Sequence, residues 1–204
     1  MIEIHPDNPQ QRLIAQVADS LREGALVAYP TDSGYALGCQ LGNAAGIERI
    51  KRLRDLDDKH HFTLVCADFA QLGHFVRVSN SDYRLIRSCT PGPYTFILPA
   101  TREVPRRLMH PKKKTVGVRL PDNAVALALV AALEEPLMSA TLILPGDTDP
   151  LSDGADVSER IGPQVDVIVD AGFCGGEPTT VIDLSQTPPE VARQGSGDTS
   201  RLFG

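Results

Sequence analysis

Several features that would place this sequence in a membrane, secreted or metal-binding class are missing. No run of about 18 uncharged apolar residues occurs, so the sequence predicts no membrane-spanning helix. The N-terminus, MIEIHPDNPQ, lacks a basic start followed by an apolar stretch, which argues against a secretory signal and favours the cytoplasm. The four cysteines are far apart and form no CxxC pair, so we expect free thiols rather than a zinc site or disulfides.

The usual catalytic signatures are also missing. There is no GxxxxGK[ST] loop, no GxGxxG, no GxSxG and no HExxH, which excludes a conventional P-loop or Rossmann nucleotide site and a zincin. His60 and His61 are adjacent, so they point in different directions on a helix or a strand, and we interpret them as surface or loop histidines. We predict no protein-held metal site.

Charge is distributed unevenly along the chain. The formal net charge is -6, but residues 101–119 carry seven Lys or Arg against one Glu, whereas residues 134–190 carry twelve Asp or Glu against Arg160 alone. Electrostatic fields are local over a Debye length of about 8–10 Å, so a chain that is acidic on average can bind an anion on one face. The sequence therefore favours an anionic partner.

Helical and extended patterns alternate along the chain without a linker, repeat or low-complexity tract. Helices are expected around residues 13–21, 44–53, 69–75, 81–88 and 124–133, the first with Asp7 or Asn8 as N-cap. Strands are expected at residues 25–29, 62–66, 94–98, 116–120, 137–144, 165–170 and 179–184. Strands and helices are not regularly interleaved, so we predict one α/β domain over residues 1–204 with a mixed parallel and antiparallel sheet.

Small polar residues gather directly after the first of these strands, in YPTDSGYALG (residues 29–38). Gly34 and Gly38 allow the backbone to turn or to approach a ligand closely, so the segment is either a structural turn or a binding loop. This segment resembles the signature of the YrdC/YciO-type family.

Six further segments resemble that family's motifs in the same order. They are RIKRLRDLDD (49–58), TPGPYTFIL (90–98), VGVRLP (116–121), MSATL (138–142), TTVIDL (179–184) and ARQG (192–195). The opening IHPDNPQQRLI and the wording of residues 30–38 are closer to the YciO branch. The resemblance implies a twisted mixed sheet with flanking helices and a large concave basic cleft.

The resemblance also implies a nucleotidyltransferase. Active members make threonylcarbamoyl-AMP from ATP, L-threonine and bicarbonate with Mg²⁺, in connection with tRNA threonylcarbamoyladenosine modification. The implied catalytic residues are Arg52, Arg54, Ser139 and Thr141. The implied ATP-binding residues are these four with Thr180 and Arg193. The implied threonine-binding residues are Thr31, Tyr35, Thr95, Arg119 and Thr179.

Three departures from the family pattern predict low activity. Arg52-Leu53-Arg54 stands where synthases carry Lys-x-Arg, with Lys51 as an alternative cation, and a planar guanidinium does not place phosphates as an ammonium does. Thr141 replaces an asparagine amide, and Asn123 stands where synthases often have His. The alternative to a synthase is a noncatalytic nucleotide or double-stranded RNA-binding module of the same fold.

The basic segment at residues 101–119 carries a separate hypothesis. Its cations could contact phosphates of tRNA or another structured RNA without reading sequence, and aromatic residues do not interleave with them. The candidate RNA-binding residues are Arg106, Arg107, Lys112, Lys113 and Lys114, with Arg102 nearby. The alternative is a solvated, mobile loop that only attracts ATP.

Overall fold

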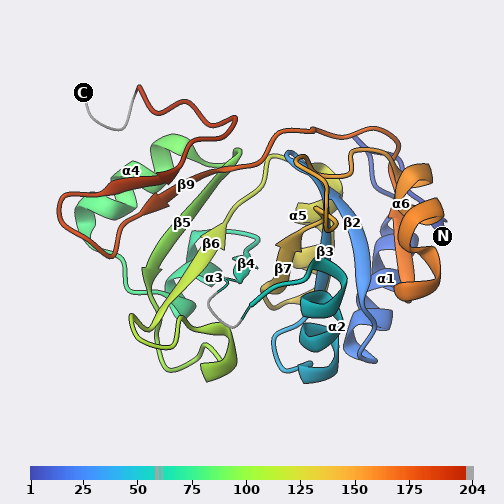
Figure 1. Ribbon diagram of the computed structural model, residues 1–204, viewed down its shortest axis with the longest axis horizontal. Coiled ribbons are helices and arrows are strands. Elements are labelled where there is room, and N and C mark those ends of the chain that lie inside the picture. Colours follow the sequence, from blue (N-terminus) through green and yellow to red (C-terminus); the bar gives the residue numbers. More distant parts are fainter. Residues whose placement is uncertain (58–59, 61, 201–204) are drawn as a thin grey trace.

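The computed structural model describes residues 1–57, 60 and 62–200, and its centre is one ten-stranded sheet (Figure 1). The order across the sheet is β1-β8-β2-β3-β7-β4-β6-β5-β9-β10. The strands are β1 (Ile2–Glu3), β2 (Val27–Thr31), β3 (Gly34–Gln40), β4 (Thr63–Val65), β5 (Tyr94–Pro99), β6 (Thr115–Arg119), β7 (Leu137–Thr141), β8 (Val167–Asp170), β9 (Thr180–Asp183) and β10 (Glu190–Arg193).

The sheet is mixed, as the sequence predicts. β8 pairs in parallel with β1 and β2, β4 with β6, and β5 with β9. The pairs β2 with β3, β3 with β7, β4 with β7, β5 with β6 and β9 with β10 are antiparallel. The helices are α1 (Gln11–Arg22), α2 (Ala44–Arg54), α3 (Phe69–Phe75), α4 (Asn80–Cys89), α5 (Ala124–Leu133) and α6 (Gly154–Ile161), with 3-10 turns η1 (Arg106–Leu108) and η2 (Gly162–Gln164).

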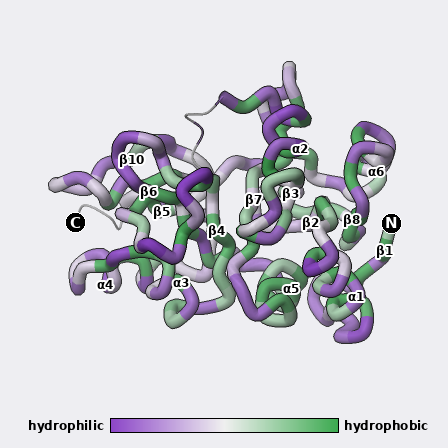
Figure 2. Tube along the Cα trace, turned by 90° about the horizontal axis from the view of Figure 1, so that it is seen from below, coloured by the Kyte–Doolittle hydropathy of each residue, from purple (hydrophilic) through white to green (hydrophobic). Residues whose placement is uncertain are grey.

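The helices flank the row of strands on two sides. Figure 2 shows α2 and α6 on one side and α1, α5, α3 and α4 on the other. α1 and α5 place their apolar residues, among them Val17 and Leu129, in one cluster with Val27 and Tyr29 of β2 and Leu137 of β7. This cluster covers one face of the sheet over β8, β2, β3 and the start of β7.

The same face of the sheet continues past β7 onto β4 and β6. In-register neighbours point to the same side of a sheet, and the register pairs Thr63 with both Ser139 and Gly117, and Gly117 with Ile97. These residues therefore share the face that α1 and α5 cover farther along the sheet. Here the face is lined by hydroxyls and a glycine instead of a packed apolar layer.

Helix α2 positions one of the predicted arginines. It begins at Asn43, whose Oδ1 accepts a hydrogen bond from Gly46 N at 2.8 Å, and its apolar residues Ile47 and Ile50 are buried. It ends where Asp55 takes a left-handed conformation, with φ of 50°. Arg54 is the last helical residue, and its Nε donates to the carbonyl of Ile143, two residues past the end of β7.

Some sequence-based expectations about elements are wrong. The cap of α1 is Gln10, without a side-chain capping bond, and the backbone N–H groups of Asp7 and Asn8 donate to His5 Nδ1 before the helix begins. Pro30 lies within β2 rather than after it. β2 pairs with β8 only through Val27 and Ala28, so the missing N–H of Pro30 removes no hydrogen bond on that side of the strand. β1, β3, β10 and α6 were not expected; β1 and β10 are the edges of the sheet, and β3 begins at Gly34 directly after a turn.

None of the helices in the described part of the chain has the length and apolar character needed to cross a bilayer.

Candidate ligand-binding site

A cavity of about 320 Å³ lies where the helical cover of the sheet ends. It is lined by Arg54, His60, Thr63, Thr95, Ile97, Gly117, Ser139, Ala140, Thr141, Ile143, Thr179, Val181 and Arg193. Two guanidinium groups and five hydroxyls thus meet over a floor of small and apolar residues. This composition suits a ligand that carries negative charge together with hydrogen-bonding groups.

The two arginines come from α2 and β10, which are far apart in the sequence. Arg54 Nε donates to the carbonyl of Ile143 at 3.2 Å, and Arg193 donates through Nε and Nη2 to the carbonyl of Thr179 at 3.1 and 2.9 Å. Burial, and next the charge of Arg193, lowers the pKa of Arg54 to about 10. Burial and the charge of Arg119 lower the pKa of Arg193. Both remain cations at neutral pH, and each would be stabilised by an anion.

Three of the five cavity hydroxyls have hydrogen-bond partners within the protein. Ser139 is buried, and its Oγ forms a hydrogen bond of 2.7 Å with the hydroxyl of Tyr29 from the neighbouring apolar cluster. Burial raises the pKa of Tyr29 to about 12, so this hydroxyl stays protonated. Thr95 Oγ1 and Thr179 Oγ1 lie 3.0 Å apart, and Arg193 Nη2 donates to Thr179 Oγ1 at 3.1 Å. These three side chains are therefore positioned before a ligand arrives.

Gly117 sets the depth of the cavity floor. A Cβ on Gly117 would lie 2.9 Å from Thr63 Oγ1 and 3.3 Å from Thr95 Cγ2, closer than side chains ordinarily pack. The glycine in VGVRLP therefore leaves space between two hydroxyl-bearing strands.

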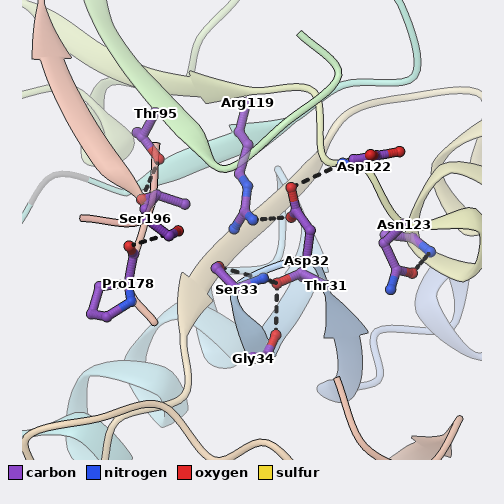
Figure 3. Close-up of polar contacts among 12 residues, drawn as sticks. Thr31, Asp32, Ser33, Gly34, Thr95, Arg119, Asp122, Asn123, Pro178 and Ser196 are labelled. Atoms are coloured by element: carbon purple, nitrogen blue, oxygen red, sulfur yellow. Dashed lines mark hydrogen bonds and ion pairs between the residues drawn. The ribbon is translucent and has the colours of Figure 1, made fainter. Parts of the chain in front are cut away.

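Arg119 lies on the same strand as Gly117, and it is paired with a carboxylate. Arg119 is 4% exposed, and its Nη2 donates to Asp32 Oδ1 in the turn between β2 and β3 (Figure 3). The second oxygen, Asp32 Oδ2, accepts from the backbone N–H of Asp122 at 3.0 Å. Arg119 is buried beside the cavity rather than among the residues that line it.

The structure brings six of the eleven candidate residues for ATP and threonine into the cavity wall. They are Arg54, Ser139, Thr141, Arg193, Thr95 and Thr179. Arg52 lies elsewhere: it is exposed and borders a separate depression with Arg49 and Pro163. Lys51, the alternative cation, is ion-paired with Glu48 at 3.3 Å.

The remaining candidates make internal contacts. Thr31 Oγ1 donates to the carbonyl of Gly34 at 2.6 Å, and Thr180 Oγ1 donates to the carbonyl of Gly197 at 2.7 Å. The Tyr35 hydroxyl donates to the carbonyl of Gly172 at 3.0 Å, and Tyr35 belongs to the cluster on the opposite face of the sheet. Thr31 and Thr180 thus tie nearby turns, while Tyr35 ties the loop at Gly172 from the opposite face of the sheet.

Sequence reasoning missed four residues of the site or its support: Tyr29, Asp32, Thr63 and His60. Tyr29 lies two residues before Thr31, and Asp32 follows Thr31 directly. Side chains alternate along a strand, and this alternation was the available signal that Tyr29 and Thr31 share a face. His60 lies in a loop, as one of the two interpretations expected, and it lines the cavity and packs edge-on against Phe62. His61 is outside the described residues.

Asn123 has a structural role. It is the N-cap of α5, and its Oδ1 accepts from Ala126 N at 2.9 Å. Its side chain is thereby committed to the helix.

The basic segment is fastened to the protein body. Val104 and Leu108 are buried, and His110 Nδ1 accepts from the amides of Lys112 and Lys113 at 3.3 and 3.0 Å. Lys113 Nζ lies 3.5 Å from Asp183 Oδ2 of β9. The six cations from Arg102 to Lys114 are exposed, so the segment presents charge from an anchored loop.

The four cysteines are free thiols in the structure; Cys39, Cys66 and Cys89 are buried and Cys174 is half-buried. Across residues 1–57, 60 and 62–200, no group of three or more His, Cys, Asp or Glu is placed to hold a metal ion.

Both the sequence and the fold are similar to those of known proteins. The model of the Sua5/YciO/YrdC family, described as telomere recombination, matches residues 19–195. The chain belongs to this family, which confirms the resemblance found in its motifs. The mixed sheet with flanking helices that the resemblance implied is confirmed as well.

Three relatives show how the similarity is graded. The crystal structure of Escherichia coli YciO is 50% identical, with a TM-score of 0.95 over 98% of this chain and 97% of that chain. A threonylcarbamoyl-AMP synthase of Vibrio vulnificus is 30% identical over 159 residues, 76% of this chain and 84% of the relative. Pyrococcus abyssi Sua5 complexed with L-threonine is 28% identical, with a TM-score of 0.87 over 95% of this chain and 57% of that one.

Proposed function

We propose that this protein binds ATP and L-threonine in the cavity and forms threonylcarbamoyl-AMP slowly. The observation that carries the proposal is the convergence of Arg54 and Arg193 with five hydroxyls in one cavity. Family membership supports it, since synthases and a threonine-bound Sua5 share the fold. The connection with tRNA modification is what membership of the family implies, and it is part of this proposal.

The reaction asks little covalent chemistry of the protein. The ammonium group of threonine combines with bicarbonate and loses water and a proton, giving a carbamate. A carbamate oxygen then attacks the α-phosphorus of ATP, and the bond to the β-phosphate oxygen breaks, releasing pyrophosphate. Positioning of the two reactants and neutralisation of phosphate charge provide most of the rate enhancement.

The residues divide between these two tasks. Arg54 and Arg193 are cations without an ion pair among the described residues, so they suit the triphosphate. Thr95 and Thr179 form a hydroxyl pair next to Arg193 that suits the amino acid, with Arg119 as the partner of its carboxylate. Ser139 and Thr141 lie on β7 at the cavity wall. Mg²⁺ would arrive bound to the phosphates of ATP and help to neutralise them.

Slow turnover follows from Thr141. A threonine hydroxyl reaches less far than an asparagine amide and cannot offer a carbonyl and an N–H from one side chain. Removing an interaction that forms mainly in the transition state lowers turnover more than it lowers ATP affinity.

Pyrophosphate release by the purified protein tests the proposal. The full mixture contains ATP, Mg²⁺, bicarbonate and L-threonine, and each component is omitted in turn. We expect release that needs all four and that stops in an Arg54→Ala variant but continues in Arg52→Ala. Release that is independent of L-threonine, or no release together with no ATP binding, contradicts the proposal.

The anchored basic segment favours a second candidate, a noncatalytic module that binds double-stranded RNA. Its exposed cations suit phosphates, and such binding weakens with salt by a log-log slope of about 0.9 per phosphate neutralised on a regular duplex. ATP binding without pyrophosphate release, together with RNA binding that is abolished when Lys112, Lys113 and Lys114 become Ala, would favour this candidate. Equal RNA affinity of that triple variant would exclude the segment as the RNA contact.

A further inference from the structure

Among the described residues that line the cavity, one can exchange a proton near neutral pH. Arg54 and Arg193 are cations, five other lining residues carry hydroxyls, and a further five are apolar residues or glycine. The remaining residue is His60. Guanidinium and hydroxyl groups keep their protons at neutral pH, whereas the imidazole of a histidine ordinarily titrates at about pH 6.5.

His60 lies between α2 and β4 and is tied to the protein body at two points. Its backbone N–H donates to the carbonyl of Asp57 at 3.2 Å, and its ring meets that of Phe62 edge-on, with the centroids 5.5 Å apart. Phe62 is 2% exposed, and its carbonyl accepts from Gly117 N of β6 at 3.1 Å. These contacts hold the imidazole at the wall of the cavity.

The charged groups that line the cavity with His60 are cations. Arg54 comes from α2 and Arg193 from β10, and the lining residues of β4, β5, β6, β7 and β9 carry only hydroxyl, apolar or no side chains. Arg119, buried beside the cavity at the end of β6, is compensated by Asp32. Two guanidiniums disfavour a further positive charge in the empty cavity, so they favour the neutral imidazole, which is the form that accepts a proton.

The proposed reaction has to dispose of a proton before the α-phosphorus is attacked. The ammonium nitrogen of threonine carries three protons, and the nitrogen of the carbamate carries one. One of the two lost protons leaves in the water that forms from the hydroxyl of bicarbonate, and the other passes to a base. A base beside the triphosphate and the carbamate holds this proton more tightly than neutral solvent does, because both groups are anionic.

We propose that His60 is the proton acceptor for carbamate formation. Its imidazole takes one proton from the threonine ammonium, and the nitrogen lone pair forms the bond to the carbon of bicarbonate. The C–O bond to the bicarbonate hydroxyl breaks, and this oxygen leaves as water with the second proton. The imidazolium keeps its proton through adenylyl transfer and releases it to solvent after the products dissociate. The inference rests on the proposed function and assigns a step for which the resemblance implies no residue.

Two variants of His60 separate proton transfer from packing. His60→Gln keeps a polar side chain, and His60→Phe keeps an aromatic ring for the edge-on contact with Phe62. Neither side chain accepts a proton at neutral pH, and both variants keep the backbone N–H that bonds to Asp57. His74→Gln is the matched control, because His74 is exposed on α3 and does not line the cavity.

The first measurement is the amount of bound carbamate, which does not depend on turnover. Carbon-13 NMR follows labelled bicarbonate with L-threonine, Mg²⁺ and an ATP analogue that has a methylene bridge between its α- and β-phosphates, so no pyrophosphate leaves. At about pH 7 we expect the wild type and His74→Gln to hold about tenfold more carbamate than either variant of His60. At about pH 9 the difference should be within about twofold, because release of the proton to solvent becomes about tenfold more favourable per pH unit.

The second measurement is threonine-dependent pyrophosphate release with ATP. The kcat/KM for L-threonine should show the same ratios, about tenfold lower in both His60 variants at about pH 7 and nearly equal to the wild type at about pH 9. The ratio of variant to wild type at each pH cancels the ionisation of bicarbonate and free threonine. ATP affinity should stay within about twofold of the wild type, since the arginines are unchanged.

The outcomes separate this proposal from the proposed function. Equal carbamate in the wild type and His60→Gln at about pH 7, the wild-type level in His60→Phe, or no carbamate in the wild type overturns the proposal. A deficit that is constant with pH, or failure of both His60 variants to fold by circular dichroism, shows a structural role and also overturns it. Carbamate that depends on His60 without pyrophosphate release contradicts the proposed function alone.

Discussion

Two halves of one sheet face differ in what covers them. Over β8, β2 and β3 the face carries Val27, Tyr29 and Ala36, and helices α1 and α5 bury it in an apolar cluster. Over β4, β6 and β5 the same face carries Thr63, Gly117 and Thr95, and it borders the cavity. β7 spans the change, since Leu137 belongs to the apolar cluster and Ser139 and Thr141 line the cavity.

The difference separates residues that stabilise the fold from residues available to a ligand. Burial of apolar area gives about 25 cal/mol per Å², so the covered half provides stability. Hydroxyls and guanidiniums gain little from burial and need partners, so the uncovered half provides binding. Substitutions on the two halves should therefore affect different measurements.

The largest effect is expected from Arg54→Ala combined with Arg193→Ala. Each charge-assisted phosphate contact contributes about 1.5–3 kcal/mol, so removal of both should weaken ATP binding at least hundredfold. Calorimetric titration with ATP and Mg²⁺ measures it, and circular dichroism confirms that the variant is folded. Arg52→Ala is the matched control from the same helix, and an equal weakening in that variant would move the phosphate site to Arg52.

Leu129→Ala should affect stability instead. Leu129 is fully buried between α5 and the covered half, so the cavity left behind should lower the free energy of unfolding by about 2–5 kcal/mol. Thr63→Ala, on the uncovered half, should lower it by less than about 1 kcal/mol. Urea unfolding distinguishes them, and comparable decreases would show that the two halves do not divide the tasks.

Thr141→Asn should raise activity. The amide supplies the donor and acceptor that the hydroxyl lacks, and recovery of ~1.4 kcal/mol in the transition state gives about a tenfold gain in threonine-dependent pyrophosphate release. Thr141→Val, which removes the hydroxyl at nearly constant size, should give no gain. Adding Arg52→Lys should change nothing further, because Arg52 lies outside the cavity. A gain only with Arg52→Lys present would contradict this expectation.

The smallest expected effect is that of Tyr29→Phe, which crosses the boundary between the two halves. It removes the hydroxyl that holds Ser139, so the free energy of unfolding should fall by about 1 kcal/mol and pyrophosphate release by about fivefold. With Ser139→Ala the decreases should be less than additive, since both changes remove the same hydrogen bond. Full additivity would show that the two hydroxyls act separately.

Much of the architecture follows from local patterns. The expected helices at 44–53, 69–75 and 124–133 correspond to α2, α3 and α5, and the strands expected at 62–66, 94–98 and 116–120 contain or overlap β4, β5 and β6. Periodicity and capping are properties of short segments, so the sequence carries them directly. β3 was missed because Gly34 and Gly38 read as turn residues, although β3 is a central strand.

The family, the mixed α/β class and the types of residue available for binding anions can all be inferred from the chain alone. Which of those residues meet depends on how the chain folds back on itself. Arg54 and Arg193 lie far apart in the chain, and whether Arg54 or Arg52 enters the cavity depends on where α2 ends and how it packs. Likewise, Asp32 and Arg119 form an ion pair because the turn after β2 folds toward the end of β6. Such pairings are set by long-range packing, which no local pattern encodes.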